Sequence, residues 1–156
     1  MARRDLERLL AELTPFSGLR DADLTTVAAC GQNVSFAAGT YLFREGEPAD
    51  RFFLLRQGRL ALEAAEPGRG ALVIDTIGPG EVAGFSWLFP PYRWQFDGHA
   101  LDRIAAVAFD GSCLRGKCDG DPRLGYELMK HFSSVMTDRM QSARIRLLDL
   151  YGQTAG

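Results

Sequence analysis

The residues best suited to chemistry are concentrated in one short segment, Phe85–Phe96, which reads FSWLFPPYRWQF. The segment holds both tryptophans of the chain and four further aromatic residues, with Arg93 as its only charged side chain. Aromatic walls around one positive charge suit a planar or apolar anion, because a guanidinium can form paired hydrogen bonds with a carboxylate or phosphate. The same arginine could instead stack on Tyr92 or Trp94 as a cation–π partner, or be solvated at a strand edge.

The aromatic side chains of this segment also have a purely structural interpretation. They alternate in spacing, so one set could fill the interior of the domain where a ligand would otherwise lie. A filled interior and an aromatic cage around a planar ligand predict the same sequence, and both interpretations stay open at this point. The two alternating sets are Phe85, Trp87 and Phe89, then Tyr92, Trp94 and Phe96.

Other chemistry finds little support in the sequence. No Ser-His-Asp arrangement, nucleophile elbow or phosphate-binding GxxxxGK motif can be placed. We therefore expect no enzymatic activity, no metal ion and no resident cofactor, and we interpret Cys30 and Cys113 as apolar helix residues. The cysteines and histidines that were considered as zinc ligands lack a recognisable spacing: Cys113, Cys118, His99 and His131.

Length and composition restrict the class of protein. A chain of 156 residues with 46% apolar and 24% charged residues is typical of one globular domain. The net charge of −2 argues against a general nucleic-acid binder, which would normally show a basic face. No long apolar run and no apolar signal segment are present, so we expect neither a membrane span nor export. Three cysteines, an odd number, fit a cytoplasmic protein in a reducing environment.

Hydrophobic periodicity predicts two short helices within residues 1–31. The second should begin near Asp21, whose carboxylate, like that of Asp23, suits a helix N-terminus, and it should stop at Gly31. The first should end at Pro15. Its apolar face consists of Leu6, Leu9, Leu10 and Leu13.

From residue 33 to residue 110 the pattern changes to short β-branched and aromatic runs separated by glycine-rich turns. Short strands at intervals of about ten residues predict an antiparallel β-roll or barrel. A pocket segment, 78–96, interrupts the strands. The predicted strands are 40–44, 51–56, 59–64, 71–77, 96–101 and 104–109.

Residues 111–152 return to a helical pattern. Asp110 is predicted to cap a short helix through Cys113 and Leu114, and Asp121-Pro122 is a strong start for a second, long helix. A helix of this length cannot lie wholly on a small roll, so we expect part of it to pack on a second copy of the chain. Its apolar residues recur at heptad-like spacing: Met129, Phe132, Met136, Met140, Ala143, Leu147 and Leu150.

In this order, the predicted elements resemble the cyclic-nucleotide-binding domain, and in particular the sensory domain of the catabolite-activator (Crp/Fnr-like) family of bacterial regulators. The resemblance covers about residues 14–152. It implies a single domain over residues 1–156 that is mainly β with flanking helices, with an antiparallel β-roll of the double-stranded β-helix or jelly-roll type. The motifs that carry it are Pro15–Leu19, Phe36, Gly39-Thr40, Phe43–Asp50, Phe52–Arg59 and Gly78–Glu81.

The resemblance also implies a phosphate-binding cassette after the turn Gly78–Gly80. In the family, a glutamate that follows a glycine accepts the ribose 2′-hydroxyl, and an arginine about nine residues later pairs with the cyclic phosphate. Here Gly84 matches the cassette glycine, but Phe85 stands where the glutamate should be. The ribose anchor is therefore lost. Ser86 and Trp87 follow as further pocket candidates.

The phosphate anchor is displaced or missing as well. The family's arginine position falls on Trp94, with Arg93 one residue early and Gln95 at the hydroxyl position. A displacement of one residue turns a strand side chain to the other face of its sheet. Arg93 could still bind the phosphate if Pro90-Pro91 re-routes the loop. We expect the binding of cyclic AMP or cyclic GMP to be weak or absent, and an aryl or acyl carboxylate is an alternative ligand.

In the family, polar residues midway along the long helix contact the purine where the two protomers meet. The matching residues here are Thr137, Asp138 and Arg139. Asp138 and Arg139 are therefore pocket candidates, and a solvated helix face is the alternative interpretation.

We therefore hypothesise a stand-alone, homodimeric sensor that binds a small-molecule effector and signals through dimer geometry or a partner protein. The segment Leu147–Gly152 resembles the hinge that leads into a winged helix-turn-helix, but no such motif follows in the sequence, so no DNA partner is expected. The alternative is a ligandless dimeric interaction module whose pocket is filled by its own aromatic residues.

Overall fold

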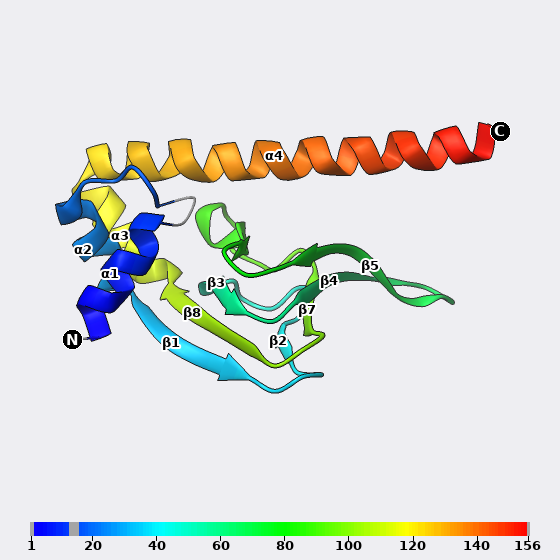
Figure 1. Ribbon diagram of the computed structural model, residues 1–156, viewed down its shortest axis with the longest axis horizontal. Helices are drawn as coiled ribbons and strands as arrows, with labels where there is room; N and C mark the ends of the chain where they lie inside the picture. The colour runs from blue at the N-terminus through cyan, green and yellow to red at the C-terminus, as the bar shows by residue number, and fades with distance from the viewer. Residues whose placement is uncertain (1, 13–15, 156) are drawn as a thin grey trace.

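The computed structural model describes residues 2–12 and 16–155, and the side chains of residues 5–12 and 16–152. Helix α1 (Ala2–Glu12) and helix α2 (Asp21–Ala28) pack together at one end of the molecule (Figure 1). Leu6 and Leu10 of the predicted apolar face are buried. Leu13 and Pro15, on which the predicted end of the first helix depended, lie outside the described residues.

The predicted end of the second helix at Gly31 is wrong. Helix α2 ends at Ala28, and Gly31 is the first residue of strand β1 (Gly31–Phe36). It pairs with Phe109 of strand β8 (Ile104–Asp110). A Cβ atom at Gly31 would lie 2.9 Å from Cε1 of the Phe109 ring. The glycine therefore makes room for a core aromatic side chain and does not cap a helix.

The strands that the structure describes form two four-stranded antiparallel sheets, which together make the predicted roll. In the first sheet the order is β1, β8, β3 (Arg51–Gln57) and β6 (Val82–Ala83). In the second sheet the order is β2 (Tyr41–Phe43), β7 (Asp97–Ala100), β4 (Leu60–Glu66) and β5 (Gly70–Ile77). All six predicted strand segments are confirmed. Strands β1 and β6 were not predicted.

Strand β3 separates two clusters of buried side chains among the described residues. Successive residues of a strand point to opposite faces, and Phe52 and Phe53 follow this rule. Phe52 belongs to the cluster between the first sheet and the helices, together with Phe16 and Phe109. Phe53 belongs to the cluster between the two sheets. Because both faces of β3 are covered, its sequence is a continuous apolar run.

The two C-terminal helices begin where the sequence predicts. Asp110 accepts a hydrogen bond from the backbone N–H of Cys113 at 3.0 Å, at the start of helix α3 (Gly111–Gly120). Asp121 accepts one from the backbone N–H of Leu124 at 3.3 Å, at the start of helix α4 (Pro122–Ala155). Both carboxylates satisfy N–H groups that have no partner within a helix.

Helix α4 packs on the roll and then continues along it for most of the molecule's length (Figure 1). Leu124, Leu128 and Phe132 in its first part are buried. In its second part Met140 is 69% exposed and Leu147 is 55% exposed. No helix in the described part of the chain is both long and apolar enough to cross a membrane.

The interpretation of Cys30 and Cys113 as apolar helix residues is wrong for Cys30, which lies outside the helices, and it did not include a bond between the two cysteines. Cys30 lies in the turn between α2 and β1, and it forms a disulfide with Cys113 in the first turn of α3. The backbone N–H of Asp110 donates to the carbonyl oxygen of Cys30 at 2.9 Å, which brings the two segments together. Cys118 is the unpaired cysteine. The odd number of cysteines therefore gives no support for a reducing environment.

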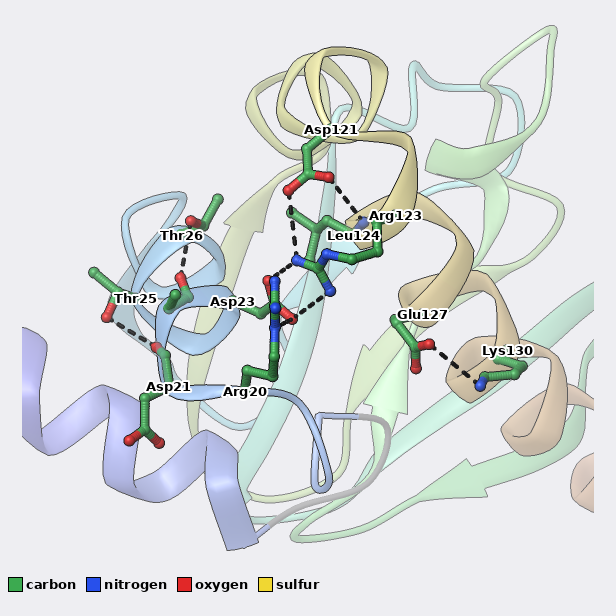
Figure 2. A network of polar contacts seen from close by, with 11 residues as sticks. Arg20, Asp21, Asp23, Thr25, Thr26, Asp121, Arg123, Leu124, Glu127 and Lys130 are labelled. Carbon is green, nitrogen blue, oxygen red and sulfur yellow. Dashed lines mark hydrogen bonds and ion pairs between the residues drawn. The ribbon is translucent and has the colours of Figure 1, made fainter.

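A buried carboxylate joins α2 to the start of α4 (Figure 2). Asp23 is 4% exposed and accepts a hydrogen bond from Nη1 of Arg123 at 3.1 Å, and Arg20 lies 3.6 Å away on the other side. The hydrogen bond from Arg123 holds the pKa of the Asp23 carboxyl below its usual range, although burial acts in the opposite direction. Asp23 was predicted only to suit the helix dipole, and its main role is this connection.

Candidate functional site

The candidate site is a cavity of about 530 Å³ between the second sheet, the segment Gly84–Phe96 and helix α4. Strands β2, β4 and β5 form one wall. The pocket segment forms a second wall, which includes Phe89 and Phe96. Three residues of α4 complete the lining: Arg139, Ala143 and Arg146. The predicted pocket segment and the long helix therefore meet around one open space.

All but two of the predicted site residues line this cavity. Trp87 does not, because it lies in the one-turn helix Ser86–Leu88 and points into the core, where it is 1% exposed and stacks on Phe52 at 4.6 Å between ring centroids. Asp138 is exposed on α4 and does not line the cavity either. The residues that do are Gly84, Phe85, Ser86, Arg93, Trp94, Gln95 and Arg139.

Trp94, which the resemblance aligns with the family's arginine, fills the space beside Gly84. It is 7% exposed and stacks on Phe43 with 3.7 Å between ring centroids. A Cβ atom at Gly84 would lie 2.7 Å from Cη2 of the Trp94 indole. A main-chain hydrogen bond holds Trp94 in place, since the backbone N–H of Trp94 donates to the carbonyl oxygen of Glu47 at 3.0 Å.

Arg93 lies beside the cavity and is exposed. Its Nη1 donates to the carbonyl oxygen of Gly46 at 3.1 Å. The stacking of Arg93 on Tyr92 or Trp94, one of the alternatives that the sequence left open, does not occur among the described residues. The guanidinium over the Tyr92 ring, 4.2 Å from its centroid, belongs to Arg115 of α3. Arg93 therefore lines the cavity as an exposed cation whose guanidinium donates to the Gly46 carbonyl oxygen.

Arg139 brings a second positive charge to the cavity, from the helix side. Its side chain is half-buried, and Nη2 donates to the carbonyl oxygen of Val82 in β6. The guanidinium carbon lies 4.9 Å from the centroid of the Phe85 ring. Burial lowers the pKa of the Arg139 guanidinium, and the nearby carboxylates of Glu81 and Asp75 partly oppose this shift. Arg139 thus places a cation against an apolar wall.

Asp75 and Arg146 are site residues that sequence reasoning missed. Nη1 of Arg146 lies 3.6 Å from Oδ1 of Asp75 and 3.3 Å from the carbonyl oxygen of Ile74, so this pair joins α4 to β5. Arg139, Ala143 and Arg146 follow one another at i, i+4 and i+7, a spacing that places them on one face of a helix. That spacing is a signal by which Arg146 could have been found.

The two interpretations of the aromatic segment each hold for part of it. Trp87 and Trp94 are buried and fill interior space, whereas Phe89 and Phe96 are exposed and line a cavity that stays open. No group of three or more potential metal ligands occurs among the described residues. The arrangement combines apolar walls with arginine side chains, which suits non-covalent binding of a small anionic molecule.

Residues 33–121 match a protein-family model described as the cyclic nucleotide-binding domain. A CRP-like cAMP-activated global transcriptional regulator from Mycobacterium tuberculosis is 23% identical over 145 residues, which are 93% of this chain and 63% of the relative. This chain therefore spans less than two thirds of that relative's length.

Solved structures with the same fold include a cyclic nucleotide-binding domain from Methylobacillus flagellatus, with a TM-score of 0.79 and 16% identity over 95% of this chain and 83% of that one. The sensor domain of the transcriptional regulator DNR from Pseudomonas aeruginosa has a TM-score of 0.72 and 18% identity, over 90% of this chain and 94% of that one. At these identities the likeness shows the fold alone. Because the family match covers more than half of its residues, this chain belongs to the cyclic nucleotide-binding domain family.

Proposed function

We propose that this chain is an effector-binding sensor domain, which binds a small molecule in the cavity and transmits the binding event through α4. The observation that carries the proposal is the open cavity of about 530 Å³, which α4 itself lines. A ligand that contacts α4 differently in two positions of the helix shifts the balance between them. The same open volume argues against the ligandless module, in which aromatic side chains would fill the space.

The site supports weak or absent binding of ordinary cyclic nucleotides. The side chain of Phe85 cannot accept a hydrogen bond from a ribose hydroxyl as a carboxylate would, and the resemblance aligns Trp94 with the family's phosphate-binding arginine. Loss of a charge-assisted hydrogen bond costs about 1.5–3 kcal/mol. That loss corresponds to roughly one to two decades of affinity.

The output of the sensor is proposed to pass through a homodimer or a partner protein. Apolar side chains are exposed on α4 beside the face that lines the cavity, and they include Met140 and Leu147. A row of exposed apolar residues on a long helix is suited to pack on another helix. The curated relatives include two transcriptional regulators from Mycobacterium tuberculosis, which supports a binding function over catalysis.

Calorimetric titration of a neutral aromatic alcohol, 4-phenylbutan-1-ol, tests whether the cavity accepts a ligand. We expect saturable binding that is lost in Ala143→Phe, because the larger side chain would occupy the cavity. Ser142→Phe, which places the same side chain on a neighbouring exposed position, should bind like the unmodified chain. Absence of binding, or equal binding by both variants, would remove the support for a ligand-binding cavity.

Titration with cyclic AMP and cyclic GMP tests the nucleotide part of the proposal. We expect no saturable binding at micromolar nucleotide. Micromolar binding that is lost in Arg93→Ala but kept in Arg103→Ala would mean that Arg93 binds the phosphate. The cassette would then work in an altered form, and the proposal of weak nucleotide binding would be wrong.

A further inference from the structure

The three arginines that line the cavity differ in how their charges are balanced. Arg146 lies 3.6 Å from the carboxylate of Asp75. Arg93 is exposed to solvent, which screens its charge. Arg139 is half-buried and forms no ion pair with any residue that the structure describes. Of the three, Arg139 is therefore the cation whose charge is least compensated.

The hydrogen bonding of Arg139 is also incomplete. A guanidinium has five N–H donors. In the described part of the chain, the guanidinium of Arg139 donates to one acceptor, the carbonyl oxygen of Val82. The ring of Phe85 lies against the same guanidinium. The carboxylates of Glu81 and Asp75, which act electrostatically on Arg139, have other partners: Asp75 pairs with Arg146, and Glu81 accepts a hydrogen bond from the backbone N–H of Gly78 at 2.9 Å. A partly desolvated cation that forms no direct ion pair favours the entry of an anion.

The walls around Arg139 restrict the rest of the ligand. They include Phe85, Ile74 and Ala143, and the cavity volume of about 530 Å³ lies in the range of small-molecule sites. One guanidinium can pair with one planar carboxylate through two parallel hydrogen bonds. A single guanidinium balances the one charge of a carboxylate but only half of the charge of a phosphate dianion. The chemistry therefore fits an apolar body that ends in a single carboxylate.

We infer that the cavity selects an aryl or acyl carboxylate, and that Arg139 of α4, not an arginine of the pocket segment, binds the carboxylate group. The inference rests on the proposed function, and it names the ligand class and the residue that recognises it. The carboxylate competes with the Val82 carbonyl for the guanidinium. Ligand binding then changes a contact between α4 and β6, which is a direct route from the cavity to the long helix.

Two probes that share one body test the inference: 4-phenylbutyrate and 4-phenylbutan-1-ol. The unmodified chain should bind the acid at least about ten-fold more tightly than the alcohol, since a charge-assisted hydrogen bond contributes to binding only in the acid. Arg139→Gln should weaken binding of the acid by about 10- to 100-fold and leave binding of the alcohol unchanged. Arg144→Gln is the matched control on an exposed position of the same helix and should change neither.

The outcomes separate this inference from the proposed function. Equal binding of acid and alcohol by the unmodified chain overturns the inference and leaves the sensor proposal standing. A preference for the acid that survives in Arg139→Gln but disappears in Arg93→Gln would mean that Arg93 of the pocket segment binds the carboxylate. That result would also overturn the inference. If neither probe binds, both proposals fail. Should Arg139→Gln fold poorly, Arg139→Lys retains the positive charge, and it should keep part of the preference for the acid.

Discussion

Gly84 and Trp94 fit together so closely that each restricts what can stand at the other position. Gly84 has a φ of +109°, a backbone conformation that favours glycine. The Trp94 indole lies where a Cβ atom of residue 84 would point. The glycine that the family resemblance assigns to a ligand cassette is here required by an aromatic side chain of the same segment.

Gly84→Ala should therefore destabilise the chain by about 1–3 kcal/mol, the usual cost of an extra methyl group in a packed interior. The positive φ adds backbone strain for any residue with a Cβ atom. Urea denaturation measures the change. Gly116→Ala in α3, where nothing lies within 4 Å of the added Cβ, should lose no stability. Equal stability of both variants would contradict the close packing of Trp94 on Gly84.

Among the elements, α2 and α4 are joined by the carboxylate of Asp23, and this connection depends on pH. The pKa of Asp23 is lower in the folded chain than in the unfolded chain, where it is about 3.9. Folding therefore favours the ionised form. The stabilisation is fully present above the unfolded pKa and is lost as the pH falls through the folded pKa.

Asp23→Asn should lower the melting temperature at neutral pH and reduce the fall in melting temperature on acidification. Thermal unfolding followed by circular dichroism from pH 7 to acid pH measures both effects. Asp5→Asn, which changes an exposed carboxylate of α1, is the control and should match the unmodified chain. A variant whose melting temperature falls as steeply with acid as that of the unmodified chain would show that Asp23 makes no such contribution.

The disulfide between the α2–β1 turn and α3 closes a long loop, since its cysteines lie 83 residues apart. Its loss in Cys30→Ala/Cys113→Ala should cost about 2–5 kcal/mol of stability. Urea denaturation with and without dithiothreitol measures the effect, and the reductant should destabilise the unmodified chain but not this variant.

Cys118→Ala serves as the control for the disulfide. Burial, with the carboxylates of Asp119 and Asp121, raises the pKa of the Cys118 thiol, so this cysteine is expected to react slowly. The control should keep its sensitivity to dithiothreitol. An unmodified chain whose stability is the same with and without the reductant would show that the disulfide does not form.

The elements that the sequence predicts correctly have local signals. Asp110 and Asp121 precede helices as capping carboxylates, and glycine-rich turns separate the strands. Strand β1 has no such signal, because its sequence GQNVSF is mostly polar. The disulfide joins residues too far apart for their spacing to show the pairing, and an odd number of cysteines obscured it.

The residues of the cavity that lie within the segment Gly84–Phe96 could be predicted from the sequence, because they are close together in the chain. The order of motifs pointed to Gly84, Phe85, Arg93 and Trp94, and all four line the cavity. Alternating spacing could not reveal that Trp87 points into the core, because a one-turn helix breaks the strand period at that point. Asp75 was missed because it comes from a strand, β5, whose approach to α4 depends on the tertiary fold.

On the scale of the whole molecule, α4 has an apolar face that its own roll leaves exposed. If this face forms a dimer, Met140→Lys/Leu147→Lys should shift the chain from dimer to monomer, because two buried ammonium groups per helix would oppose packing. Sedimentation velocity measures the shift. Ser134→Lys/Gln141→Lys adds the same charge on exposed polar positions and should leave the distribution unchanged. A double variant that sediments like the unmodified chain would rule out this face as the interface.

Because one continuous helix both lines the cavity and carries the exposed apolar face, occupancy and self-association are thermodynamically linked in the proposed dimer. A ligand that changes the association constant by some factor must have its own affinity changed by the same factor in return. The apparent dissociation constant of the ligand would then vary with the concentration of the chain. The abundance of the protein would set the ligand concentration to which it responds.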